Sequence, residues 1–312
     1  MASYHATKPA GITAVDISAD GNLALTGGND KAVQIYDLAE KKVVATLKGH
    51  TKKVTHVAFA EAEGSNATAI SAGADGKLRT YTANESGKWA VDKTISAHKQ
   101  DITGLALHPS KSFVATASVD STWAFHDIEK GTTVQTFEPL SSTEEGSYSY
   151  SSLAVHPDGL LHGAGTVDGI VRIWDVRDKT ALAATVSNES GASIPALSFS
   201  ENGYHLAVAN SAASSIGIFD LRKLSLLHTI NLPTASAPGG GKIASLRFDS
   251  SGQFLACAGT DLRVFKNKTW EEALLFEGNT GELTDVRFGP LGNSIVLSGA
   301  DRTVRVLGAP SA

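Results

Sequence analysis

The chain has 312 residues, of which 42% are hydrophobic and 19% are charged. This is enough apolar material for a large core, and the length fits either two ordinary domains or one array of repeats. The formal net charge of −5 excludes a protein-wide basic field that attracts nucleic acid, so RNA contact would need a local basic patch. The lone Cys257 excludes an internal disulfide and is typical of a reducing compartment.

The start of the chain carries no secretory or membrane signal. It lacks a basic segment followed by an apolar one, and no run along the chain approaches the about 20 apolar residues of a membrane span. A repeating pattern begins almost at once. The abrupt start predicts that the chain is the C-terminal part of a longer protein.

One type of segment recurs seven times, at intervals of about 40 to 50 residues, which is the period of propeller blades. The segments begin near residues 12, 54, 102, 152, 194, 243 and 283. Each alternates apolar and polar residues, which predicts a strand with one buried face. A strand rich in Ala, Gly and Ser, a tight turn, a third strand and a more polar fourth strand follow. We predict an all-β fold in which residues 1–312 form a single seven-bladed propeller with four-stranded blades.

Closure of this ring needs a fourth strand for the last unit. Almost nothing follows the third strand of that unit, so residues 3–9, SYHATKP, are predicted to complete it and to remove the open sheet edges. Two longer polar connections, 141–151 and 233–242, are predicted to be mobile loops between blades.

The register of the tight turns is the most specific pattern in the chain. Six residues after the turn aspartate stands a large side chain in five units. The pairs are Asp30 with Tyr36, Asp75 with Tyr81, Asp120 with His126, Asp168 with Trp174, and Asp301 with Leu307. The fifth unit keeps the spacing but has Ala213 in place of the acid, and the sixth is two residues short.

These units resemble WD repeats. The resemblance rests on Gly49-His50 before a first strand, on the turn acids, and on Trp174-Asp175 at the end of a third strand. It implies a buried hydrogen-bonded set made of a His, a Ser or Thr, the turn Asp and an aromatic residue. The implied sets are His50, Ser71, Asp75 and Tyr81 in the second unit, His98, Thr116, Asp120 and His126 in the third, and Asp168 with Trp174 in the fourth.

A His–Ser–Asp set also suggests a hydrolase. A catalytic set needs an exposed nucleophile and an oxyanion pocket, whereas this set repeats with the period of the fold and should lie buried between strands. We therefore interpret it as structural and predict no catalytic residue. The sequence GGGK (239–242) lacks the Ser or Thr and the helix of a phosphate loop, and the histidines show no metal spacing, so we predict no cofactor and no metal.

Loops before first strands face the rim that WD propellers use for ligands, and comparable turns lie beside them. The candidate partner-binding residues are Lys31, Lys52, Lys53, Lys99, Asp101 and Arg302.

Longer strings resemble one family, the C-terminal propeller of pre-mRNA-processing factor 19. They include ATLKGHTKKVTHVAF (45–59), STWAFHDI (121–128) and HPDGLLHGAGTVDG (156–169), and the likeness fails only in a few loops. The resemblance implies an upstream U-box, a tetramer-forming coiled coil, and a nuclear role in splicing and the DNA-damage response. The chain has neither U-box nor heptads, so it would not transfer ubiquitin itself. It would instead bind splicing proteins and ubiquitination substrates, as a monomer in isolation.

Three other hypotheses stay open. A generic WD scaffold unrelated to ubiquitin or splicing would bind proteins by the same rim, and the sequence upstream distinguishes it. An enzyme is disfavoured by the absence of nucleophile, cofactor and metal signatures. RNA contact is disfavoured by the net charge.

Overall fold

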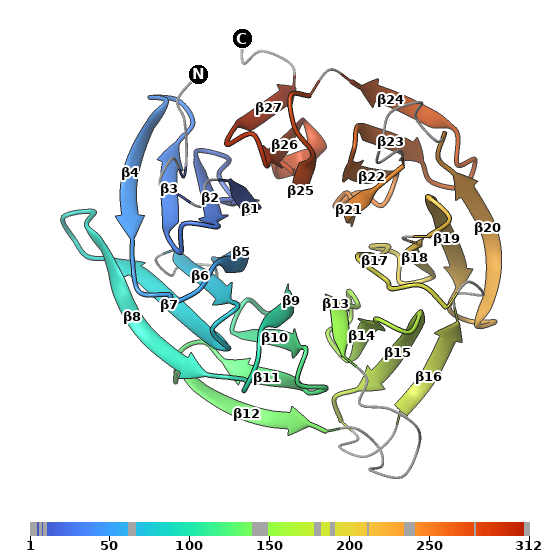
Figure 1. The fold of residues 1–312 in the computed structure, drawn as a ribbon, viewed down its shortest axis with the longest axis horizontal. Helices are drawn as coiled ribbons and strands as arrows, with labels where there is room; N and C mark the ends of the chain where they lie inside the picture. Colours follow the sequence, from blue (N-terminus) through green and yellow to red (C-terminus); the bar gives the residue numbers. More distant parts are fainter. Residues whose placement is uncertain are drawn as a thin grey trace.

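The strands form a ring of seven sheets around a central axis (Figure 1). A computed structural model describes His5, Lys8 and residues 11–61, 67–138, 149–177, 182–187, 191–210, 212–233, 241–277 and 279–308. The sheets are called blades one to seven in chain order. Within these ranges no helix is long and apolar enough to cross a membrane.

Six blades have four antiparallel strands in sequence order. Blade one contains β1 (Ile12–Ile17), β2 (Leu23–Gly28), β3 (Val33–Asp37) and β4 (Lys42–Leu47). Blade two contains β5 (Val54–Ala60), β6 (Thr68–Gly73), β7 (Lys77–Ala83) and β8 (Trp89–Ser96). Blade three contains β9 (Ile102–Leu107), β10 (Phe113–Ser118), β11 (Trp123–Asp127) and β12 (Thr132–Phe137).

The next three blades repeat this order. Blade four contains β13 (Tyr150–Val155), β14 (Leu161–Thr166), β15 (Ile170–Asp175) and β16 (Leu182–Ser187). Blade five contains β17 (Leu197–Phe199), β18 (His205–Asn210), β19 (Ser215–Asp220) and β20 (Ser225–Asn231). Blade six contains β21 (Ile243–Phe248), β22 (Phe254–Gly259), β23 (Leu262–Lys266) and β24 (Glu272–Phe276).

Blade seven has three strands within the described residues, β25 (Leu283–Phe288), β26 (Ser294–Gly299) and β27 (Val304–Gly308), with a single 3₁₀ turn, η1 (Pro290–Gly292), after the first. The predicted all-β propeller of seven blades is confirmed. The segment predicted to complete blade seven, residues 3–9, lies outside the described residues except for His5 and Lys8. The two loops predicted to be mobile lie mostly outside them as well.

Burial explains why each strand takes its place in a blade. The small-residue second strands are buried almost throughout, as in TAISAG of β6 and FVATAS of β10, because both faces pack against neighbouring blades. Fourth strands are mostly exposed, as in β4 and β12, and lie at the outside of the ring (Figure 1).

First strands line the central channel and are tied to each other by hydroxyl groups. The hydroxyl of Thr13 in blade one donates to the carbonyl of Val54 in blade two at 2.6 Å. Thr103 of blade three bonds the carbonyl of Tyr150 in blade four in the same way, at 2.7 Å. Each bond satisfies a channel-facing polar group and sets the spacing of two blades.

The two ends of the array meet between β1 and β25, which pack side by side. There Arg287 of blade seven donates from Nε to Asp16 of blade one at 3.2 Å and from Nη1 to Asp285 at 2.7 Å. The backbone N–H of Val15 reaches Asp285 Oδ2 at 3.3 Å. This seam network, formed by Asp16, Asp285 and Arg287, joins the first and last blades across the channel wall.

Candidate functional site

All first strands begin at one end of the channel and finish at the other. The end where they begin also carries the turns between second and third strands, and its cavity measures about 60 Å³. A funnel of about 520 Å³ opens at the end where they finish. We call these ends the narrow rim and the wide rim.

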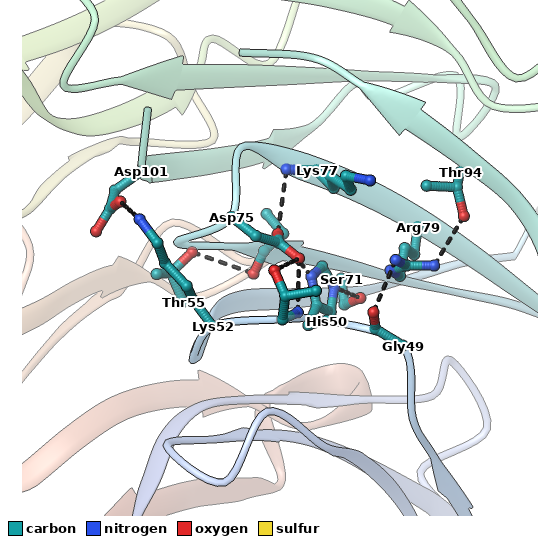
Figure 2. A network of polar contacts seen from close by, with 12 residues as sticks. Gly49, His50, Lys52, Thr55, Ser71, Asp75, Lys77, Arg79, Thr94 and Asp101 are labelled. Atoms are coloured by element: carbon teal, nitrogen blue, oxygen red, sulfur yellow. Dashed lines mark hydrogen bonds and ion pairs between the residues drawn. The ribbon is translucent and has the colours of Figure 1, made fainter. Parts of the chain in front are cut away.

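The six candidate partner-binding residues all lie on the narrow rim. Lys52 and Asp101, from the loops before β5 and β9, form an ion pair at 3.2 Å (Figure 2). Lys53 and Lys99 lie in the same two loops and are exposed. The loops are anchored by their backbones, because the N–H of Lys99 bonds Asp120 and the carbonyl of Lys53 accepts from Ala74. Their backbones are thus held while their lysine side chains face solvent.

Two further cations occupy strained turn positions on this rim. Lys31 has φ 67° and Arg302 has φ 68°, in the left-handed region that favours glycine. Blades two and four have Gly76 and Gly169 at the equivalent position. At these two positions the turn therefore holds a lysine or arginine in a backbone conformation that non-glycine residues disfavour.

Blade two carries a complete buried polar set (Figure 2). His50 lies between Asp75, 2.9 Å from Nδ1, and Ser71, 2.7 Å from Nε2. The Ser71 hydroxyl is 3.0 Å from the Tyr81 hydroxyl. Asp75 also accepts from the backbone N–H of Thr51 at 2.9 Å. The set therefore ties the loop before β5 to the β6–β7 turn and to β7.

The protonation states of this set follow from burial and hydrogen bonding. Burial lowers the pKa of His50 despite the adjacent carboxylate, so the imidazole is neutral at pH 7. Burial alone would raise the pKa of Asp75, but the hydrogen bonds from Thr51 and His50 outweigh it and hold the pKa below its usual value. Ser71 is fully buried, and no surface path brings a substrate to its hydroxyl. This geometry fits a structural tie rather than a nucleophile.

Blade three contains a variant of the set. His98 Nε2 is 2.8 Å from the Thr116 hydroxyl, which is 2.7 Å from His126 Nε2. The turn acid lies farther from the histidine than in blade two, with Asp120 Oδ1 at 3.4 Å from His98 Nδ1. Thr122 stands between them, 2.8 Å from His98 Nδ1 and donating to Asp120 at 2.6 Å. The structure thus brings the four predicted residues together and adds a fifth.

Blade one has a set that was not predicted. His5 is buried, with Nδ1 at 2.7 Å from Asp30 and Nε2 at 3.0 Å from the Thr26 hydroxyl. A signal was available, because His5 and Asp30 are separated by 25 residues, as are His50 and Asp75. The distance from His5 to its first strand is longer than in blade two, and this longer distance hid the match.

Blade four does not gather its two predicted residues into such a set. Asp168 is partly exposed and lies 3.9 Å from Arg172. Trp174 is buried and packs near Trp123 of blade three, with ring centroids 6.3 Å apart. The described part of blade four is therefore held against blade three by aromatic packing, which the Trp174–Trp123 pair provides.

These features define a class, the WD-repeat propeller. The model of the WD domain, G-beta repeat, matches residues 2–37, 41–82, 89–127, 137–175 and 270–306, which is more than half of the chain. The chain belongs to this family. The unmatched stretch, 176–269, contains blade five and the first three strands of blade six, where the turn acid is lost or displaced.

Particular relatives are similar over nearly the whole chain. Pre-mRNA-processing factor 19 of Caenorhabditis elegans is 39% identical over 97% of this chain and 58% of its own length. The proteins of the same name from Homo sapiens and Oryza sativa subsp. japonica are 36% and 33% identical, over 96% and 98% of this chain and 56% of their own lengths. The predicted resemblance to that family is confirmed, and the chain spans little more than half the length of these relatives.

Proposed function

We propose that this chain is the protein-docking propeller of a nuclear ubiquitin ligase of the splicing machinery. The observation that carries the proposal is the similarity, over nearly the whole chain, to relatives named pre-mRNA-processing factor 19. In the full protein a U-box would recruit the ubiquitin-conjugating enzyme and a coiled coil would form the tetramer. A role in the DNA-damage response belongs to the same proposal.

The narrow rim is the docking surface in this proposal. Four exposed cations lie there, namely Lys31, Lys53, Lys99 and Arg302. Lys52 lies beside them and forms an ion pair with Asp101. Cations from blades one, two, three and seven thus gather on one end of a ring whose net charge is −5. The rim therefore suits an acidic segment of a splicing protein, with electrostatic attraction raising the rate of encounter.

The mechanism is positional. A rigid ring holds its ligand on a few anchors, and the linkage to the remote U-box raises the local concentration of substrate at the transferring enzyme. No bond is made or broken by the propeller itself. Ubiquitination substrates and stable splicing partners would compete for the same rim.

A generic WD scaffold is the alternative, and the sequence upstream of this chain separates the two. A U-box followed by heptads supports the ligase, and any other domain there contradicts it. RNA would compete for the lysines, and a binding curve for single-stranded RNA that falls steeply with salt would favour it over a protein ligand.

Crosslinking capture from nuclear extract tests the proposal. The wild-type propeller is expected to retain splicing proteins, identified by mass spectrometry, and the Lys53→Glu/Lys99→Glu variant to retain about tenfold less. Lys88→Glu/Lys223→Glu is the matched control, because these exposed lysines lie in turns between third and fourth strands on the wide rim. Recovery of splicing proteins that is unchanged by the narrow-rim reversal contradicts docking there, and recovery of none contradicts the splicing role.

A further inference from the structure

Equivalent positions of the seven first strands form the wall of the wide-rim funnel. The side chains at these positions differ in size and charge from blade to blade. Counted from residues 12, 54, 102, 150, 194, 243 and 283, the fifth residue of each segment forms one layer of the wall. The layer consists of Asp16, Ala58, Ala106, Ala154, Ser198, Arg247 and Arg287. Two arginines, from blades six and seven, and an aspartate from blade one therefore face small residues from blades two to five. The small residues leave the volume into which the charged side chains point.

Two of the three charged side chains are already used. Asp16 accepts from Arg287 and from the backbone N–H of Phe59 at 2.7 Å. Asp285, one layer deeper, accepts from Arg287, from the Ser245 hydroxyl at 2.7 Å and from the Val15 N–H. Every carboxylate oxygen of the seam network thus has a partner. These acids are closed to a further ligand.

Arg247 is different. Its guanidinium has no hydrogen bond and no ion pair with any residue that the structure describes, and it borders both the funnel and the smaller cavity. Burial of the guanidinium and then the nearby Arg287 lower the pKa of Arg247 to about 10, against the smaller opposing effects of Asp285 and Asp16, so it stays charged at pH 7. The Nδ1 atom of His56, which lines the adjoining small cavity, is buried and also lacks a partner within the described ranges. A half-buried cation without a direct hydrogen bond or ion pair is stabilised when a ligand supplies the anion.

Apolar side chains surround the entrance to Arg247. The half-buried apolar side chains that line the funnel are Ile17, Leu107, Val155 and Phe288. Among the charged groups there, Lys111 is exposed, Glu201 is exposed, and Glu61 is engaged by the Ala19 N–H at 2.9 Å. Although the residue as a whole is exposed, partial burial of its carboxyl group, and then Asp249, raise the pKa of Glu201. A ligand that enters must therefore combine apolar surface with an acceptor for one guanidinium.

We propose that the funnel is a second docking site, which takes an aspartate or glutamate side chain flanked by apolar residues on an extended segment of a partner protein, with its carboxylate on Arg247. The fork of the guanidinium matches a carboxylate in two parallel hydrogen bonds. The seam network carries one net negative charge, but its acids lie beyond ion-pair distance of Arg247. Direct contact with Arg247 outweighs their repulsion, because Coulomb energy falls with distance.

The site goes beyond the narrow rim, since it lies at the opposite end of the channel and uses blade six. A ring with both sites could hold two partners, or two segments of one partner, at fixed separation. The half-buried apolar side chains of the funnel supply the area that the segment covers, and the carboxylate fixes the register of the segment.

Selection of peptides tests this site without a known partner. A phage-displayed library of random dodecapeptides is selected on the wild-type propeller, and the enriched peptides are made with acetylated and amidated ends. We expect an acidic residue next to an aromatic or aliphatic one. Affinity measured by fluorescence anisotropy should fall at least tenfold with Arg247→Gln, and less with Arg247→Lys, which keeps the charge but loses the fork.

A double-mutant cycle assigns the contact. Replacing the acidic residue of the peptide by its amide should weaken binding by the same factor, with no further loss on Arg247→Gln. Arg177→Gln is the control, an exposed arginine of blade four that pairs with Asp175. The thermal midpoint of Arg247→Gln should equal or exceed that of wild type, since no contact is lost.

Three results would overturn the proposal: no peptide enriched, enriched peptides without acidic residues, or binding that is indifferent to Arg247→Gln. Titration with inorganic phosphate and with acetate, followed by the side-chain N–H resonance of Arg247, separates a free anion from a protein segment. Tight binding of phosphate that no peptide displaces would identify a small-anion site instead.

Discussion

Blade two and blade five have the same strand order but are held by different forces. In blade two, Asp75 joins His50, Thr51 and Lys77 across one turn. Blade five has Ala213 at the position of the acid, and the side chain of Asn210 accepts from the nearby N–H groups of Ala212 and Ala213.

Apolar packing replaces the polar tie in blade five. Ile216 and Ile218 are fully buried in a cluster that continues into blade six through Phe248, Leu255 and Trp270. A blade can thus lose its polar set when both of its walls are apolar. The set is one way to stabilise a shared fold, which explains why it recurs with the fold and not with a chemical function.

The largest effect is expected where polar groups tie blades together across the seam. Arg287→Met leaves the buried Asp285 and the half-buried Asp16 without their cation and should lower the free energy of unfolding by about 3 to 5 kcal/mol. Arg263→Met in blade six is the control, because its partners Asp261 and Glu272 are partly exposed, and a loss below about 1 kcal/mol is expected. Urea unfolding measures both; equal losses would show that the seam has no special role.

The second-largest effect is expected when the turn acid is removed from a blade that carries the polar set. The same change in a blade without the set should cost less free energy of unfolding. Asp75→Ala leaves His50 and two backbone N–H groups without their acceptor, and we expect a loss of about 2 to 3 kcal/mol. Asp261→Ala, at the displaced turn of blade six, should cost less than about 1 kcal/mol. Thermal unfolding of the two variants side by side decides the matter. A larger loss for Asp261→Ala would reverse the comparison.

A buried histidine in blade four should make its wall sensitive to acid. His162 stacks on Trp123 at 5.1 Å, and neither ring nitrogen has a partner among the described residues. Burial is the main cause that lowers the pKa of His162 to about 3. His108 lowers it by a smaller amount, and Asp158 opposes the shift. The folded state binds this proton less tightly than the unfolded state. Stability is therefore full above pH 6.5 and is lost as pH falls toward 3.

His162→Leu removes this titration and fills the site with apolar atoms. At pH 4 the variant should be more stable than wild type by on the order of 2 to 3 kcal/mol, and at pH 7 the difference should be much smaller. Unfolding curves at the two pH values provide the measurement. A stability difference independent of pH would exclude His162 as the acid-sensitive group.

The smallest effect is expected at the strained turn of blade one. Lys31→Gly relieves a left-handed backbone and should raise the free energy of unfolding by about 0.5 kcal/mol, because glycine adopts this φ without a Cβ penalty. The same change removes a rim cation and should weaken capture of splicing partners. Greater stability with unchanged capture would remove Lys31 from the docking surface.

Much of the fold could be predicted because its determinants are local. The alternation within first strands, the small residues of second strands and the constant turn spacing each describe one blade, and seven copies fix the ring. The set around His50 could be predicted for the same reason. The set around His5 was missed because its loop differs in length, and Thr122 was missed because it inserts into an otherwise regular register.

The seam network and the funnel could not be predicted in this way. Asp16 and Arg287 lie near opposite ends of the sequence and meet only because the ring closes, and Arg247 lines the same funnel. Their positions within the repeat could be read from the sequence, because each is the fifth residue of its segment. Which neighbours they would meet, and that Arg247 would meet none, depends on the small side chains across the channel.

One pair of variants tests most directly whether the buried sets hold the fold while the rim binds partners. Asp75→Ala should lower the free energy of unfolding by about 2 to 3 kcal/mol yet retain splicing proteins normally at a temperature where it is folded. Lys53→Glu/Lys99→Glu should unfold like wild type and retain about tenfold less. Loss of binding in folded Asp75→Ala, with full binding by the lysine variant, would contradict the account.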